Sequence, residues 1–179
     1  MTTTTTDDAV QVPRAGQYAI DSRGSTLTFR SRHLFGLAPV RGTMAIRHGL
    51  VDVADPITDS SVQVEIDTTS FHTGSRHRDG DVRSAQFLDA ARYPSMTFTS
   101  ERLDRSNGHW TLTGTLIVRD VARPVSLAIE QSAVQHGTAS SFVACATTRI
   151  DRTDFGLTAA RGMAGRHLDV SLRILGVRR

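Results

Sequence analysis

The chain has 179 residues, 39% of them hydrophobic, which suits one domain with a substantial interior, and no apolar run reaches the roughly 18 residues of a membrane span. All 21 basic residues are arginine, so lysine-dependent chemistry is excluded, including Schiff bases, lysine-anchored pyridoxal phosphate and the P-loop. The net charge of +3 is spread along the chain without a basic cluster interleaved with aromatics, which argues against a nucleic-acid partner.

The N-terminal segment is polar and begins MTTTTTDDAV. We expect residues 1–15 to form a disordered tail and residues 16–179 to form a single domain. This start lacks the basic patch and the apolar stretch of a secretory signal. The single cysteine, Cys145, lies in the apolar stretch FVACA, where no internal disulfide is possible and a buried, inert thiol is expected. These features predict a cytoplasmic protein without a transmembrane segment.

Most of the chain alternates between apolar and polar residues with a period of two, which predicts strands. About eight strands in antiparallel order, several of about ten residues, favour a closed barrel over a short-stranded sandwich. Turn signals such as Asn107-Gly108 and Gly137 separate some of them. In chain order, the expected strands cover residues 27–33, 40–46, 62–66, 95–103, 110–119, 125–129, 142–150 and 170–174.

One connection departs from the strand pattern. After Ile66 the chain enters a polar run over residues 73–81, and the following VRSAQFLDAA, residues 82–91, predicts a short helix. Hairpin connections are much shorter than this. We therefore predict that residues 73–87 form one lip of the barrel mouth. Within this lip, Arg78 and Asp79 are expected to form an internal ion pair or a helix cap.

The expected inward-facing positions mix small residues with a few phenylalanines and methionines. An eight-stranded barrel either fills with its own side chains or holds one small ligand. Small residues such as Gly42, Gly114 and Ala144 leave volume unfilled, which favours an apolar cavity. The alternative, a barrel plugged by its own phenylalanines, stays open at this point. We expect the following residues to line the interior: Phe29, Met44, Phe98, Leu116, Leu127, Phe142 and Leu172.

Several short motifs, in collinear order over residues 16–176, resemble the YceI-like family. Individually they are weak, but together they form a specific pattern. Asp81 departs from it, because the family commonly has a histidine two residues after its Arg-Asp. Residues 159–166 also diverge from the family in character. The matching motifs are Tyr18-Ala19-Ile20-Asp21, the alternation Ser25, Leu27 and Phe29, then His33, Val40-Arg41-Gly42, Thr73-Gly74, Arg78-Asp79, Tyr93-Pro94, the stretch from Gly114 to Asp120, Arg123-Pro124-Val125, and the stretch from Ile150 to Gly156.

The resemblance implies an all-β fold, an extended eight-stranded antiparallel lipocalin-like barrel with one or two short helices capping its mouth. The family's central pore is associated with polyisoprenoid or similar long apolar ligands. The expected function is therefore a non-catalytic binding or carrier protein for such a lipid, without a cofactor. A polar head group would lie at the barrel end, because desolvation in the bore costs several kcal/mol. His33, Arg78 and Arg152 are the candidates to meet it.

Two other functions remain to be weighed. One is a barrel-pocket enzyme of the isomerase or cyclase type that uses His33 or Asp79 for acid–base chemistry. The other is a structural, stress-related barrel with a self-filled interior. No metal is expected, because His72, His77, Asp79 and Asp81 lack a fixed ligand spacing. The sequence also leaves open whether the protein is a monomer or a homodimer.

Overall fold

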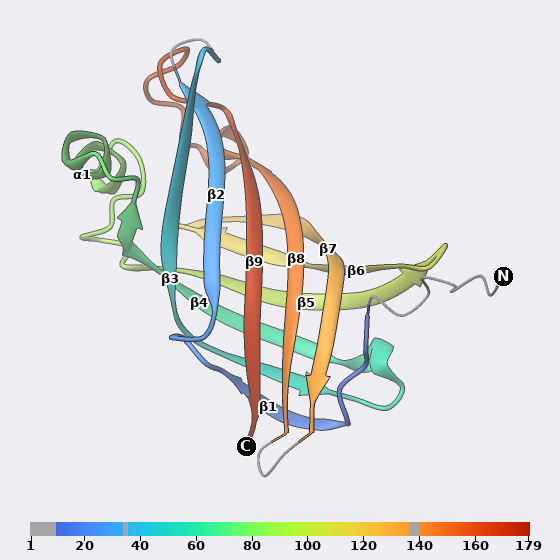
Figure 1. Cartoon of the computed structure of the whole chain (residues 1–179). Coiled ribbons are helices and arrows are strands. Elements are labelled where there is room, and N and C mark those ends of the chain that lie inside the picture. The colour runs from blue at the N-terminus through green and yellow to red at the C-terminus, as the bar shows by residue number, and fades with distance from the viewer. Residues whose placement is uncertain (1–9, 34–35, 137–139) are drawn as a thin grey trace, which may run out of the picture.

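The computed structural model describes residues 10–33, 36–136 and 140–179, and its strands wrap into a barrel (Figure 1). Within the described ranges, no helix combines the length and the apolar character needed to span a bilayer. The elements in chain order are β1 (Gly16–Ile20), β2 (Thr26–His33), β3 (Ala38–Val53), the 3-10 turn η1 (Ile57–Asp59), β4 (Ser61–His72), α1 (Arg76–Arg83), β5 (Ser95–Ser106), β6 (His109–Val118), β7 (Val121–Gln135), β8 (Ser141–Asp151), the 3-10 turn η2 (Arg152–Phe155) and β9 (His167–Arg178).

The strands form one closed antiparallel sheet. Their order is β1-β3-β2-β9-β8-β7-β6-β5-β4, and β4 pairs back onto β3. Strands β1 and β2 follow one another along the same position in the sheet, because each of them pairs with both β3 and β9. Asp21 interrupts them by accepting the N–H groups of Arg23 and Gly24 at 2.9 and 2.6 Å. The nine strands therefore build an eight-stranded barrel, which confirms the predicted fold class.

The register places the apolar phase of each strand on the inside. Leu27 is paired with Met44 of β3 on one side and with Leu172 of β9 on the other. Met44 and Leu172, both expected in the interior, therefore lie at the same height in the barrel. On the other wall Phe98 faces Leu116 across β5 and β6. Successive side chains of a strand point to opposite faces of the sheet. Once one residue of a regular strand is known to face inward, the facing of the others in that strand follows. Cys145 lies on the outward phase of β8 and is half-buried, so the expectation of a buried thiol was wrong.

The helix of the long β4–β5 connection begins earlier than the sequence predicted. It spans Arg76–Arg83, and the side chain of Ser75 caps it by accepting the N–H of Arg78. The segment expected to be helical, residues 82–91, is mostly a series of tight turns. Its Phe87, Leu88 and Ala90 are all buried. The N–H groups of Leu88 and Ala90 donate to the carbonyls of Val82 and Arg83 instead of to the carbonyls four residues back, so the helix does not continue.

The connections divide between the two ends of the barrel. The mouth end carries the end of β2, the start of β3, the β6–β7 connection, α1 with its turns, and the η2 loop (Figure 1). The far end carries β1, η1, the β5–β6 connection, the end of β7 and the start of β8. At this far end the backbone N–H of Gln11 donates to the Ser132 carbonyl at 2.8 Å. Gln11 belongs to the predicted tail over residues 1–15, of which residues 1–9 lie outside the described residues.

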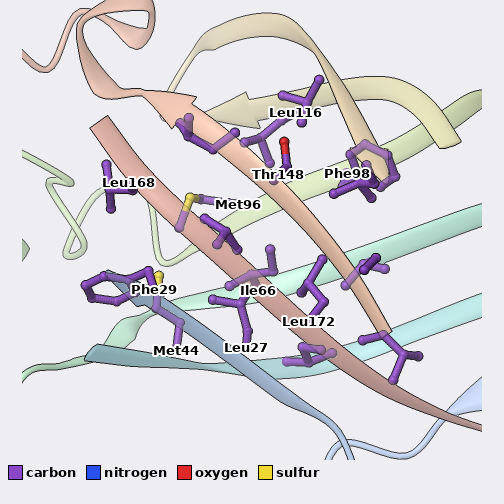
Figure 2. Close-up of a pocket in the computed structure, with 18 of the residues that line it drawn as sticks. Leu27, Phe29, Met44, Ile66, Met96, Phe98, Leu116, Thr148, Leu168 and Leu172 are labelled. Atoms are coloured by element: carbon purple, nitrogen blue, oxygen red, sulfur yellow. The ribbon is translucent and has the colours of Figure 1, made fainter. Parts of the chain in front are cut away.

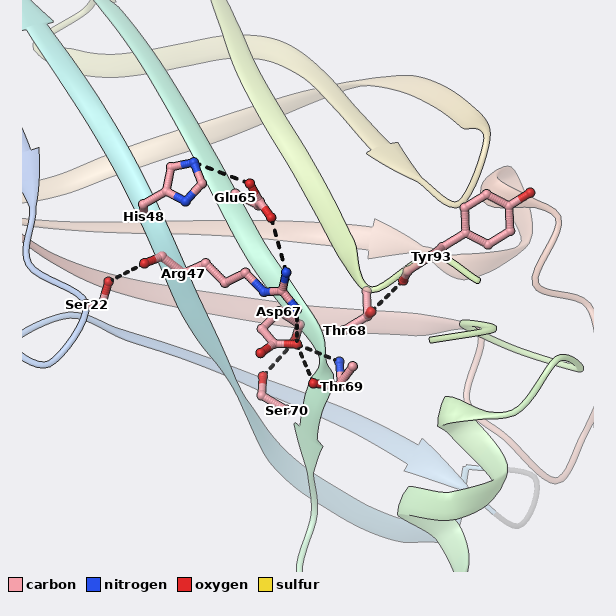
Figure 3. A network of polar contacts seen from close by, with 9 residues as sticks. All are labelled: Ser22, Arg47, His48, Glu65, Asp67, Thr68, Thr69, Ser70 and Tyr93. Atoms are coloured by element: carbon pink, nitrogen blue, oxygen red, sulfur yellow. Dashed lines mark hydrogen bonds and ion pairs between the residues drawn. The ribbon is translucent and has the colours of Figure 1, made fainter. Parts of the chain in front are cut away.

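A polar network fastens the outer face of β3 and β4, where the ladder shifts register twice (Figure 3). Arg47 lies 3.5 Å from Glu65 and 3.2 Å from Asp67. Asp67 in turn accepts the N–H and the hydroxyl of Thr69, at 2.9 and 2.6 Å. Bulges of this kind bend a strand, and here the polar contacts hold the bent strands together outside the barrel. The network thereby shapes the wall without entering the interior.

Candidate functional site

The barrel encloses an apolar cavity of about 410 Å³. Its walls come from all eight barrel strands, and Figure 2 shows side chains converging on it from both walls. The lining reaches from His33 and Arg152 at the mouth end to Val53 and Phe142 at the far end. Ligand sites in proteins usually have about 300–1,000 Å³, so the cavity is large enough for one small molecule.

Every apolar residue that the sequence predicted for the interior lines this cavity. The seven are Phe29, Met44, Phe98, Leu116, Leu127, Phe142 and Leu172. The three phenylalanines are buried yet leave the bore open, so they line the interior rather than plug it. Their part in binding a ligand stays a prediction.

The bore carries few polar groups. Thr148 of β8 points its hydroxyl into it among apolar neighbours (Figure 2). This hydroxyl donates to the Ser126 carbonyl of β7 at 2.8 Å, so its hydrogen is already used. Because its hydrogen bond is made within the protein, Thr148 needs no polar partner from an occupant of the bore, which favours an apolar occupant.

Arg152 braces the loop that follows η2. Its side chain is buried, with 7% of the residue's surface exposed. The guanidinium donates to the carbonyls of Gly165, at 2.8 Å, Ala164, at 3.1 Å, and Leu157. All three of its nitrogens are thus engaged with backbone oxygens of the loop, even though the residue lines the cavity.

Asp151 fastens the same loop from the preceding position. Its carboxylate accepts the N–H and hydroxyl of Thr153, at 2.9 and 2.6 Å, and pairs with Arg166 at 2.6 Å. Burial opposes its ionisation, but these hydrogen bonds and the Arg166 charge lower the pKa of Asp151 to about 2. The loop is therefore held by an ionised carboxylate and a buried guanidinium side by side.

Arg78 and Asp79 are linked through Thr73 rather than to each other. The Thr73 hydroxyl donates to Asp79 at 2.5 Å and accepts from the Arg78 Nε at 2.7 Å. The predicted direct ion pair was therefore wrong, as was the predicted cap, because Ser75 caps the helix. Only Arg78 of the two lines the cavity.

Asp79 is the most buried charged residue of this lip, with 4% exposed. It also accepts the Thr73 N–H at 2.9 Å and lies 3.3 Å from His72 Nδ1. Burial raises its pKa, but the Thr73 hydrogen bonds and the charges of His72 and Arg83 outweigh this and leave the pKa lowered. A carboxylate stabilised in this way is a weak base, which disfavours acid–base chemistry at Asp79.

His33 ends β2 at the mouth and lines the cavity, facing Ala38 across the β2–β3 ladder. The structure thus brings His33, Arg78 and Arg152 to one end of the cavity, as the sequence predicted, while their contact with a head group remains untested. Among the described residues, no group of three or more His, Cys, Asp or Glu side chains is arranged to hold a metal ion.

Sequence reasoning missed several lining residues. Ile66, Met96 and Leu168 continue the same period-two phase and could have been found from it (Figure 2). The segment 10–13 also lines the cavity, from the far end. It is too short to show a period of two, and it lies beside the far end of β7, where Val10 forms a parallel bridge with Ser132.

A family model and the sequences of known relatives match most of this chain. The model of the YceI-like domain matches residues 18–175. A UPF0312 protein of Vibrio parahaemolyticus is 30% identical over 174 residues, covering 93% of this chain and 89% of the relative. A UPF0312 protein of Shewanella baltica is 33% identical over 176 residues, covering 92% and 89%.

Solved structures share the fold at lower identity. BcnA of Burkholderia cenocepacia superposes with a TM-score of 0.71 at 21% identity, covering 87% of this chain and 98% of that one. A polyisoprenoid binding domain from Saccharophagus degradans, implicated in plant cell wall breakdown, superposes with a TM-score of 0.65 at 17% identity, covering 90% and 98%.

Proposed function

The chain belongs to the YceI-like domain family, and from that premise we propose that it is a non-catalytic binding protein that holds a long apolar ligand, such as a polyisoprenoid, along the bore of its barrel. The observation that carries the proposal is the apolar cavity, whose lining extends from the mouth end to the far end. The polyisoprenoid binding domain from Saccharophagus degradans, which has the same fold, supports the choice of ligand class.

The shape of the cavity favours a chain over a compact molecule. Each additional stretch of chain placed in the bore removes apolar surface from water at both ligand and wall. This burial is worth roughly 25 cal/mol per Å². An apolar site whose lining runs from the mouth end to the far end therefore rewards ligand length until the bore is full.

A polar end of the ligand would lie at the mouth, next to Arg78 and His33. Arg78 donates from Nε and Nη2 to Thr73, and the residue lines the cavity from a half-buried position. All three guanidinium nitrogens of Arg152 donate hydrogen bonds to carbonyls of the loop. We therefore propose that Arg152 stabilises the loop and does not bind the head group. Arginine at a partly hydrated rim suits a head group that would lose its water inside the bore.

The test is a length series of all-trans prenyl alcohols, measured by native mass spectrometry and by titration calorimetry. We expect affinity to rise with each isoprene unit and then to level off. The prenyl diphosphates, compared with Arg78→Gln and the exposed control Arg161→Gln, report on the mouth. Affinity that is independent of chain length would contradict the proposal, whereas a length dependence without an Arg78 effect would remove only the head-group assignment.

A further inference from the structure

Three phenylalanine rings of the bore lie against glycines of a neighbouring strand, and in two cases the glycine is the direct partner of the phenylalanine in the ladder. Phe29 of β2 faces Gly42 of β3, and Phe142 of β8 faces Gly176 of β9. One pair lies near the mouth and the other near the far end. Glycine in a strand marks a place where another group approaches the backbone closely, and here that group is an aromatic ring.

The space above each glycine is occupied by the ring. A Cβ built on Gly176 would lie closer than 3.0 Å to three atoms of the Phe142 ring. A Cβ on Gly42 would lie as close to two atoms of the Phe29 ring. Side-chain Cβ atoms essentially never make such contacts, so any larger residue would displace the ring. The glycines therefore let the rings lie back against the wall.

At the far end, the displaced ring would have one direction left to move. The rings of Phe142 and Tyr18 pack in a T-shaped arrangement, with ring centres 5.2 Å apart and an interplanar angle of 71°. Tyr18 itself is 1% exposed and packs with Val53, so it has no room to yield. The remaining open side of Phe142 is the cavity that it lines.

We infer that the Phe142–Gly176 pair sets the depth of the bore and with it the longest chain that the protein accepts. The inference rests on the proposed function, since it concerns the ligand of the same cavity. With glycine at 176 the ring lies against the wall and the bore extends to the far end. With alanine at 176 the ring enters the bore and shortens it from that end. The pair is thus a determinant of chain-length specificity.

Gly176 offers the cleanest test among the ring-bearing glycines. The third such glycine, Gly114, lies under Phe98 but also against the backbone of Thr99 and Ser100, so alanine there would disturb the ladder as well as the ring. At Gly176 the three nearest atoms all belong to Phe142.

The experiment measures the prenyl alcohol length series with Gly176→Ala, with the double variant Gly176→Ala/Phe142→Leu, and with Phe142→Ala. For Gly176→Ala we expect affinity for the longest chains to fall about tenfold or more, and affinity for farnesol to stay unchanged. The double variant should recover the long chains, and Phe142→Ala should move the plateau to longer ones. Gly80→Ala, in open space on α1, is the matched control and should keep the wild-type profile.

A second readout does not depend on any ligand. A ring lying over a glycine shifts the Hα resonances of that glycine upfield, so Gly176 Hα in the wild type should lie upfield of its position in Phe142→Leu. If the wild type binds no prenyl alcohol but shows this shift, the proposed function fails and the ring–glycine pair stands. An unshifted Gly176 Hα, or an unchanged length profile in Gly176→Ala, overturns the inference.

Discussion

Asp79 is a buried carboxylate at the lip of the mouth, and its negative charge is stabilised within a few residues of chain. Thr73 donates to it twice, and His72 lies 3.3 Å away. The same Thr73 hydroxyl receives the Arg78 guanidinium, which lines the cavity. The Asp79 carboxylate thus fixes Thr73, and Thr73 in turn positions Arg78 at the mouth. We therefore predict a structural role for Asp79, which would influence ligand binding only through the position of Arg78.

Replacing Asp79 with alanine is expected to lower the melting temperature. The change leaves the half-buried Thr73 N–H without its acceptor, which costs about 1 kcal/mol of unfolding free energy. Thermal unfolding followed by circular dichroism measures the effect. Asp81→Ala is the control, because the Asp81 side chain is 58% exposed and pairs only with an exposed histidine. A large loss of ligand binding at an unchanged melting temperature would instead make Asp79 a direct binding group.

The loop between η2 and β9 is the element that covers the mouth. Arg152 holds it from inside through three carbonyls, and Asp151 holds it from outside through Thr153 and Arg166. Backbone hydrogen bonds form local turns in the loop, such as those from Met163 and Ala164 to Ala160, and the side chains of Arg152 and Asp151 tie these turns to the barrel. Asp151 and Arg152, which are adjacent in sequence and opposite in charge, therefore both hold this loop in place.

This arrangement predicts an acid-sensitive contribution from Asp151. Its pKa is about 2 in the folded protein and 3.8 without the fold, so the unfolded state binds the proton first as pH falls. The stabilisation is complete above about pH 4 and is lost as pH falls through 2, and it amounts to about 2 kcal/mol. In urea unfolding, Asp151→Asn should lose this part of the pH dependence. Asp154→Asn, an exposed residue of the same turn, should keep the wild-type profile. Equal profiles for wild type and Asp151→Asn between pH 4 and pH 2 would contradict the assignment.

The whole barrel acts as a container because its inward positions combine rings that lie against the wall with small residues. The cavity separates the core into two clusters, a large one along the walls and a small one around Tyr18, Val53 and Phe142 at the far end. A filled interior would contribute more packing, so the open bore costs stability relative to a filled one.

Filling the bore should abolish binding without unfolding the protein. Ala146 of β8 lines the cavity, and phenylalanine there would occupy part of its 410 Å³. Because the new ring enters existing space, we expect the melting temperature to stay the same or rise while prenyl alcohol affinity falls at least about tenfold. Ala128→Phe, on the exposed face of β7, is the matched control and should bind as the wild type does. Undiminished binding in Ala146→Phe would place the ligand outside the bore.

The sequence by itself determined the strands and their inward phase, because side-chain alternation is a local property that survives any tertiary arrangement. This is why all seven predicted interior residues line the cavity. Other features needed contacts between distant parts of the chain. Whether Phe142 plugs or lines the bore depends on Gly176, thirty-four positions later but directly opposite in the ladder. The helix position depends on burying Phe87, Leu88 and Ala90 together, and the partner of Asp79 depends on how Thr73 folds back over the helix start. The pairing of strands and the closure of loops decide these contacts, and the local alternation of apolar and polar residues does not predict either of them.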